Sequence, residues 1–245
     1  MEFADVADPR APGLAGRYDL EHGCADVVVV DGIAYALAPA SSGQHEFRLH
    51  VIDASDAAQP VGIGELRLDD PAPDRFSSAR LAIGNGHVFA VTLAASGESD
   101  RQPAPRLHVI DVADPARPIR VAVVELSSPA FSVAYDDGYV FLAQAGGVSI
   151  LDVRDPANPL DVITLLVSGT AADVLAADGL VYAAAGASGL YVYAPHLPGW
   201  EPWVATPTPT VGDSTPTATS PTPTATDVAT AGPPPIVIYV PAAER

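Results

Sequence analysis

The chain has 245 residues, a net charge of −18 and no lysine, so all of its basic residues are arginines. This acidic balance, without a basic cluster, argues against nucleic acid and anionic membrane surfaces as partners, because both attract positive patches. A single cysteine, Cys24, rules out an internal disulfide and a cysteine metal site. No stretch approaches the roughly 20 apolar residues of a membrane helix, so we expect no direct membrane insertion.

The chain opens on part of a repeat and continues with four fuller copies of it. This partial repeat reads FADVADPRAP and begins at Phe3, and a predicted strand at 13–18 follows it. We predict blade-like units at 24–68, 79–126, 131–166 and 172–194. Each unit joins two apolar runs through Asp-Gly or Asn-Gly, a strong hairpin signal because these residues tolerate the positive φ of the turn. The turn glycines are Gly32, Gly86, Gly138 and Gly179.

A second motif, in the first three units, is an apolar strand that ends in Asp and enters a proline turn. It reads LHVIDASDAAQP at 49–60, LHVIDVADPARP at 107–118 and VSILDVRDPANP at 148–159. The paired carboxylates could suggest calcium, but they lack the glycine and the dense oxygen run of a calcium loop. We interpret them as structural, because Asp at the first position of a turn accepts backbone N–H groups. The pairs are Asp5/Asp8, Asp53/Asp56, Asp111/Asp114 and Asp152/Asp155.

Four short antiparallel strands in about forty residues are typical of one propeller blade. The sequence therefore predicts an all-β protein, a β-propeller of four blade-like repeats. Two arrangements stay open. The strand at 13–18 could serve as the outer strand of the last blade and close the ring, or the blades could form an open arc of a longer propeller.

These motifs resemble the LVIVD-repeat family, whose repeats pair a strand similar to YxYVA with one similar to GLxIIDVSDPxxP. The resemblance covers residues 3–195. The chain departs from the pattern in the longer loops of its first two units and in the last unit, which lacks the Asp. The resemblance implies a β-propeller and a bacterial or archaeal protein that is exported or held at the cell surface, with no defined biochemical role.

The residues after the repeats differ in kind. Residues 199–235 are rich in Thr and Pro, which predicts a disordered spacer or stalk, and residues 236–245 are a short apolar tail. We expect Trp200 and Trp203 to pack on the propeller's edge. The N-terminus has no signal peptide as given, and Met1 falls inside a repeat, so we expect upstream sequence to be missing and an extracellular or cell-surface location.

Two groups of residues are candidates for binding. If the ring closes, the polar residues at the position before each inner strand converge at the mouth of the central channel. The long loops supply a second polar group on one face. The channel-mouth residues are Asp26, Arg80, Ser132 and Asp173, and the loop-face residues are Asp70, Asp74, Arg75, Glu98, Asp100 and Arg101.

Each group also has a structural interpretation, because the first can lock neighbouring blades together and the second can be a solvated loop. No catalytic motif, metal pattern or cofactor motif is present in the sequence. We therefore expect a monomeric, non-enzymatic scaffold that binds a protein or glycan of unknown identity. The alternative is a hydrolase or lyase that works at the channel mouth with an ion.

We expect Cys24, at the start of a predicted strand, to be buried and inert.

Overall fold

The computed structural model describes residues 1–20, 23–41, 44–68, 79–92, 104–200 and 238–240. These residues are almost entirely β-structure, in small antiparallel sheets, with one 3-10 turn, η1 (Gly186–Ser188). Blade one holds β3 (Asp26–Val30), β4 (Ile33–Ser41), β5 (Gln44–Asp53) and β6 (Val61–Leu68). Blade two holds β7 (Ala79–Gly84), β8 (His87–Thr92), β9 (Arg106–Asp111) and β10 (Ile119–Glu125).

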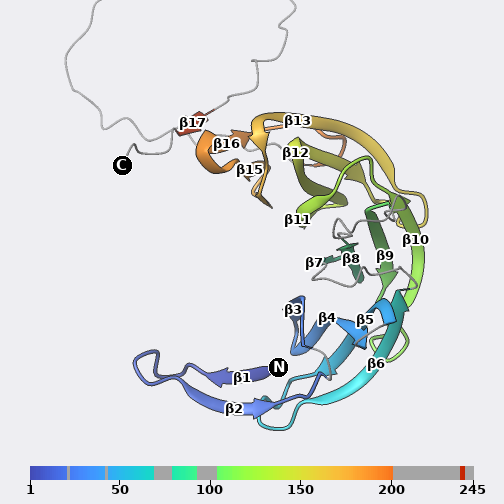
Figure 1. Ribbon diagram of the computed structural model, residues 1–245, viewed down its shortest axis with the longest axis vertical. Coiled ribbons are helices and arrows are strands. Elements are labelled where there is room, and N and C mark those ends of the chain that lie inside the picture. Colours follow the sequence, from blue (N-terminus) through green and yellow to red (C-terminus); the bar gives the residue numbers. More distant parts are fainter. Residues whose placement is uncertain (21–22, 42–43, 69–78, 93–103, 201–237, 241–245) are drawn as a thin grey trace, which may run out of the picture.

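Blade three holds β11 (Ala130–Asp136), β12 (Tyr139–Asp152) and β13 (Leu160–Thr170). Blade four holds β14 (Asp173–Ala177), β15 (Leu180–Ala184), β16 (Leu190–Tyr193) and β17 (Ile238–Val240). A separate sheet of two strands, β1 (Glu2–Asp5) and β2 (Gly13–Arg17), precedes blade one and is called the half-blade. The sheets follow one another along an arc, with β3, β7 and β11 on its inner side and β6, β10 and β13 on its outer side (Figure 1).

The four predicted hairpin turns are confirmed. Asp31, Asn85, Asp137 and Asp178 all have positive φ, between 39° and 54°, and each turn glycine that follows also has positive φ. Two successive residues with positive φ define the type of turn whose twist suits a two-residue hairpin. This turn chemistry fixes the register of the first two strands in every blade.

Blade three has the same four-strand plan although β12 is a single long strand. The N–H of Val153 donates to the carbonyl of Gly138 at 2.9 Å, which joins the two ends of β12. The same bond runs from Ala54 to Gly32 and from Val112 to Gly86 at 2.8 Å in the first two blades. β12 therefore doubles back and supplies both the second and the third strand of its blade. We call the end of the blades that carries the Asp-Gly and proline turns the turn face.

The hydrophobic core lies in layers between neighbouring blades. An aromatic residue at the same place in each second strand fills a layer: Tyr35 between blades one and two, Phe89 between two and three, and Phe141 between three and four. All three are almost fully buried. Burying an aromatic side chain of this kind stabilises the fold by about 1.5–3 kcal/mol, so each of the first three blades contributes one such contact to the blade that follows it.

Glycines let the turns of one blade pack on the outer strand of the blade before it. A Cβ on Gly64 of β6 would lie 2.3 Å from the carbonyl oxygen of Pro115 in the proline turn of blade two. A Cβ on Gly16 of β2 would lie 2.2 Å from the carbonyl oxygen of Ala57 in the turn of blade one. The two contacts are equivalent. The half-blade therefore packs on blade one in the same way as blade one packs on blade two.

The predicted closure of the ring through residues 13–18 is wrong. β2 pairs with β1, and β17 occupies the outer position beside β16. The nearby β1 satisfies the backbone groups of β2, and Met1 and Tyr18 exchange hydrogen bonds of 2.7 and 2.9 Å at the sheet's end. The half-blade and blade four lie at opposite ends of an open arc (Figure 1).

The predicted Thr/Pro-rich spacer and the apolar tail lie outside the described residues, apart from 199–200 and β17. No helix in the part of the chain that the structure describes is long and apolar enough to span a membrane.

Candidate functional site

The repeated aspartates are part of the turn architecture, as predicted. The first carboxylate of each pair accepts the N–H of the residue two positions on, at 2.9–3.0 Å. The second carboxylate does the same at 2.9–3.2 Å. Each pair thus holds its own proline turn with backbone hydrogen bonds. Within the described residues, His, Cys, Asp and Glu side chains form no group of three that could hold a metal ion.

Three of the four predicted channel-mouth residues, Asp26, Ser132 and Asp173, bond to a neighbouring blade. The Asp26 carboxylate accepts the N–H of Leu81 in blade two at 2.9 Å. The hydroxyl of Ser132 in blade three donates to Asp173 in blade four at 2.5 Å. Arg80 donates to the carbonyl of Ala79, next to it in the chain. The contacts of Asp26, Ser132 and Asp173 fit the structural interpretation, in which the polar groups join adjacent blades, whereas the Arg80 bond lies within blade two. Whether they also bind a ligand stays a prediction.

The six predicted loop-face residues, Asp70, Asp74, Arg75, Glu98, Asp100 and Arg101, lie outside the described residues. The described residues form a pocket on the turn face.

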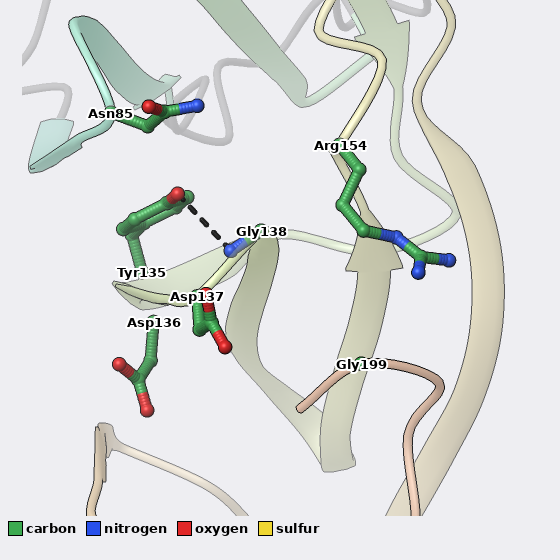
Figure 2. A pocket seen from close by; sticks show the side chains of 7 residues that line it. All are labelled: Asn85, Tyr135, Asp136, Asp137, Gly138, Arg154 and Gly199. Carbon is green, nitrogen blue, oxygen red and sulfur yellow. Dashed lines mark hydrogen bonds between the residues drawn. The ribbon is translucent and has the colours of Figure 1, made fainter. Parts of the chain in front are cut away.

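The turn-face pocket has a volume of about 550 Å³ and lies between blades two and three. Figure 2 shows Asn85, Tyr135 and Asp136 on its left, Arg154 and Gly199 on its right, and the Asp137–Gly138 turn between them. These seven residues come from three segments that are far apart in the sequence. They are Asn85, Tyr135, Asp136, Asp137, Gly138, Arg154 and Gly199.

The left wall of the pocket depends on a close approach between two blades. The Tyr135 ring stacks on Phe89 of blade two with centroids 5.1 Å apart. A Cβ on Gly84 would lie 2.0 Å from this ring, so only glycine leaves room for it. The Tyr135 oxygen accepts the N–H of Gly138 at 3.1 Å. Burial, with Asp137 and Asp136 nearby, raises the pKa of Tyr135, so its hydroxyl keeps a proton to donate at neutral pH.

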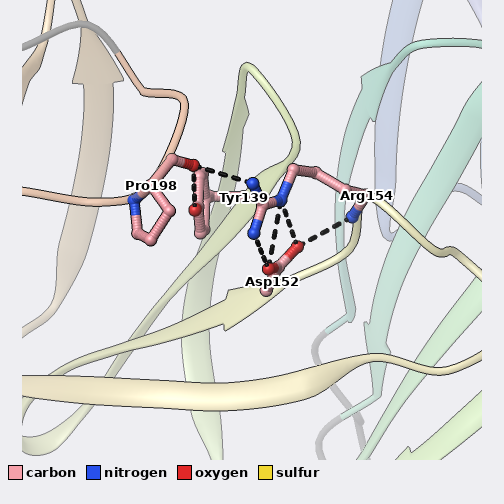
Figure 3. Close-up of polar contacts among 4 residues, drawn as sticks. All are labelled: Tyr139, Asp152, Arg154 and Pro198. Carbon is pink, nitrogen blue, oxygen red and sulfur yellow. Dashed lines mark hydrogen bonds and ion pairs between the residues drawn. The ribbon is translucent and has the colours of Figure 1, made fainter.

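The right wall is held by Arg154. Its guanidinium forms an ion pair with Asp152 and donates to the carbonyl of Pro198 at 2.9 Å (Figure 3). The Tyr139 hydroxyl donates to the same carbonyl at 2.6 Å, and the guanidinium carbon lies 5.4 Å from the centre of the Tyr139 ring. Hydrogen bonds from Arg154 lower the pKa of Asp152 and keep its carboxylate charged. Arg154 therefore ties the residues after blade four to blade three.

Trp200 completes this attachment. Its ring is 3% exposed, lies 5.5 Å from the ring of Phe141 and belongs to the layer between blades three and four. Its indole N–H donates to Asp136 at 2.9 Å. The prediction that Trp200 packs on the propeller is therefore confirmed, within a core layer rather than on the edge. Trp203 lies outside the described residues. The segment 197–200 is called the clasp.

Sequence reasoning missed the turn-face pocket, although a signal was present. Asp136 stands where the first, second and fourth units have Val30, Gly84 and Ala177. Arg154 stands where the first two units have Ser55 and Ala113. Both departures from the repeat fall in the third unit, and both line the pocket. Their convergence could not be foreseen, because it depends on the clasp.

The prediction that Cys24 is buried is wrong, because its side chain is exposed. In the described part of the chain the half-blade has only two strands, β1 and β2, and neither of them pairs with β3. The pKa of Cys24 is nevertheless raised, chiefly by partial desolvation, while the hydrogen bond to the carbonyl of Asp26 lowers it and the Asp26 charge raises it.

Alkylation of Cys24 provides a test. The thiolate is the reacting species, and a raised pKa reduces its fraction at any given pH. We expect the rate with iodoacetamide, measured by mass spectrometry in dilute native protein, to reach half its maximum at a higher pH than in urea-unfolded protein. A native midpoint at or below the unfolded one would contradict the raised pKa, and no reaction at all would contradict the exposure.

Comparisons with known proteins support the fold. The model of the LVIVD repeat matches residues 127–165, which lie mostly in blade three and include five of the seven residues that line the turn-face pocket, Tyr135–Gly138 and Arg154. No curated protein matches the sequence. Among solved structures, a protein of unknown function from Desulfotomaculum acetoxidans is 12% identical, with a TM-score of 0.54, over 80% of this chain and 59% of that one. A glutaminyl cyclase from Myxococcus xanthus is 17% identical, with a TM-score of 0.43, over 69% and 64%. The chain thus spans less than two thirds of either protein.

Proposed function

The chain carries an LVIVD repeat, and we propose that the open arc of blades built on it is a non-enzymatic scaffold that binds a protein or glycan. The fold by itself implies no activity, so the proposal rests on a site. That site is the turn-face pocket, where the third unit departs from the other repeats.

The chemistry of the pocket suits a neutral or cationic polar ligand. The Tyr135 hydroxyl can donate outward, because its oxygen already accepts the N–H of Gly138. The carboxylate of Asp137 is exposed and can accept hydrogen bonds, and the Asn85 side chain can do both. Sugar hydroxyls and peptide amides offer the complementary groups. An aromatic ring beside a few convergent polar groups is a common arrangement in binding sites.

Binding by paired variants tests this function. Asp137→Asn removes a pocket charge, and Asp178→Asn makes the same change in the equivalent turn of blade four, where φ is also positive. Wild-type protein is applied to a printed glycan array and to an array of synthetic peptides. We expect binding that Asp137→Asn reduces about tenfold or more, as loss of a charged hydrogen-bond partner does, and that Asp178→Asn leaves unchanged. Absence of binding, or equal loss in both variants, would contradict the proposal.

The alternative of a hydrolase or lyase requires Asp26, Arg80 and Asp173 to act together on one substrate. Asp26 and Asp173 instead make separate contacts, with Leu81 and Ser132 respectively. No observation on the described residues favours this alternative over the scaffold.

We also propose that the protein is exported and held at the cell surface. The support is compositional: a Thr/Pro-rich tract follows the blades, and such tracts are typical of surface stalks. Protease treatment of intact cells that express the gene with its native upstream region tests the location. The blades should be released into the medium, and their retention inside the cells would contradict export.

A further inference from the structure

The turn-face pocket is lined by two carboxylates that follow one another in the chain. Asp136 ends β11, and Asp137 begins the turn after it. At the two corresponding positions the other units have at most one carboxylate: Val30-Asp31, Gly84-Asn85 and Ala177-Asp178. The third unit therefore carries twice the negative charge of any other hairpin turn, and it carries this charge where the pocket lies.

Neither carboxylate forms an ion pair with an arginine in the described part of the chain. The guanidinium of Arg154, whose side chain also lines the pocket, pairs instead with Asp152 and donates to the carbonyl of Pro198. In Figure 2 this guanidinium points away from Asp136 and Asp137. The positive charge of Arg154 is thus neutralised by Asp152, and the charges of Asp136 and Asp137 stay uncompensated.

These two charges lie in a partly enclosed site. Asp136 is only partly exposed, and the hydrogen bond that it accepts from the indole of Trp200 comes from a neutral donor. Desolvation, and then the charges of the two carboxylates, raise the pKa of Tyr135 beside them, a direction that fits an excess of negative charge. Charges that are partly buried are screened less by salt and water than those at the open surface. The pocket therefore favours a ligand that brings a positive charge.

We propose that the turn-face pocket binds a lysine or arginine side chain of a partner protein. This inference rests on the proposed binding function of the pocket and chooses between its two classes of ligand. Proteins present ammonium and guanidinium groups at their surfaces, whereas neutral sugars carry neither group. The pocket volume of about 550 Å³ lies within the usual range for ligand sites. The side chain of Asn85 can accept from the cation or bond to the peptide groups beside it.

A divalent metal ion is a poorer match for the same groups. Calcium takes six to eight oxygen ligands, and the lining supplies two carboxylates, one of which already accepts an indole N–H. The described His, Cys, Asp and Glu side chains form no group of three that could hold a metal ion. An ammonium or guanidinium group needs only hydrogen-bond acceptors, and charge-assisted hydrogen bonds to carboxylates are the strong ones.

The charge of the whole chain favours the same class of partner. The chain has 30 acidic residues against 12 basic ones. A field of this sign speeds the association of a basic partner and opposes an acidic one. Salt weakens this attraction, because the Debye length falls from about 30 Å at 0.01 M to about 3 Å at 1 M. The affinity for a basic partner should therefore fall as ionic strength is raised over this range.

The indole of Trp200 reports on the pocket directly, because its N–H donates to Asp136. The chain has two tryptophans, so a proton–nitrogen NMR spectrum contains few indole signals, and Trp200→Phe identifies the relevant one. The full chain is titrated with blocked Gly-X-Gly peptides in which X is Arg, Lys, Gln or Glu. Cadaverine serves as a free diamine and lactose as a neutral sugar.

The arginine and lysine peptides should shift the Trp200 signal in a saturable way. The glutamine peptide should bind about tenfold more weakly or worse, as loss of a charged hydrogen-bond partner predicts. The glutamate peptide should cause no shift. Cadaverine should bind more weakly than the lysine peptide, because it lacks the peptide groups that Asn85 can contact. Raising NaCl from 0.01 M to 1 M should weaken binding of both cationic peptides.

Paired variants locate the response. Asp137→Asn removes one pocket charge, and Asp136→Asn removes the other while keeping an oxygen that can accept the indole N–H of Trp200. Each should weaken the arginine peptide about tenfold. Asp178→Asn removes the charge of the corresponding turn in blade four and should leave the affinity unchanged. Thermal melting shows that each variant is folded.

The results separate this inference from the binding function itself. Binding of the glutamine peptide or lactose as tight as that of the arginine peptide would overturn the cationic ligand while leaving a binding pocket. Equal affinities for cadaverine and the lysine peptide would overturn the assignment to a protein. If no probe shifts the Trp200 signal, the inference fails, and the glycan and peptide arrays decide separately whether the scaffold function fails with it.

Discussion

Replacing Trp200 with alanine is expected to cost about 3–5 kcal/mol of folding free energy, the range for removing a large aromatic side chain from a core. The indole is 3% exposed, packs against Phe141 and donates its N–H to Asp136. Its loss leaves a cavity in the layer between blades three and four and leaves Asp136 without this donor. A single residue beyond the last repeat would then contribute a large part of the stability of a domain of this size.

Urea unfolding, followed by circular dichroism, measures this effect. Trp200→Phe keeps most of the ring but removes the N–H, so it should lose less, about 1–2 kcal/mol for one hydrogen bond to a charged group and some packing. His196→Ala, at an exposed position beside the clasp, serves as the control and should be near neutral. A Trp200→Ala variant as stable as the control would show that the clasp does not hold blades three and four together.

Gly64→Val should destabilise the protein by about 3 kcal/mol, the upper part of the usual range for overpacking. The added Cβ would meet a backbone carbonyl of the next blade at 2.3 Å, and a backbone oxygen cannot rotate away as a side chain does. The layer between blades one and two would have to open.

The matched control is Gly13→Val, because a Cβ at Gly13 meets no atom within 4 Å. Both glycines lie on outer strands, so the two substitutions change the strand propensity by a similar amount. Only Gly64 faces the turn of a neighbouring blade. Thermal melting of the two variants compares them. Equal melting temperatures would contradict the close packing of the proline turn of blade two on β6.

The repeated plan of this molecule could be predicted because it depends on local chemistry. Asp-Gly and Asn-Gly turns need positive φ, and all four adopt it. The paired aspartates bond to N–H groups two residues on, and so their structural role is also readable from a few adjacent positions. Each motif repeats, and the repetition indicates that similar sheets stand side by side.

The ends of the arc could not be predicted in this way. Cys24 lies two residues before β3, and its exposure follows from the neighbouring half-blade, whose described residues form only two strands. β2 could pair with β1 or with β16, and the sequence motifs were compatible with either pairing. In the structure β1 satisfies the backbone groups of β2. The repeats predict the features that all copies share. The exposure of Cys24 and the partner of β2 depend instead on how the sheets at the ends of the arc differ from the other blades.

The turn-face pocket was missed for a related reason. Its walls combine a turn of blade two, the third repeat and the clasp, which lies after the repeats. Gly84 and Tyr135 approach each other only because their blades are neighbours, and Arg154 reaches Pro198 only because the clasp turns back. A search based on long loops led instead to residues that lie outside the described part of the chain.

The central claim is that consecutive repeats stack as blades through these side chains, and proton NMR tests it directly. Nuclear Overhauser contacts should connect the ring protons of Tyr135 in blade three with the α protons of Gly84 and the ring of Phe89 in blade two. Equivalent contacts should join the α protons of Gly64 to the δ protons of Pro118. A folded protein in which neither set of contacts is observed would contradict the stacked-blade architecture.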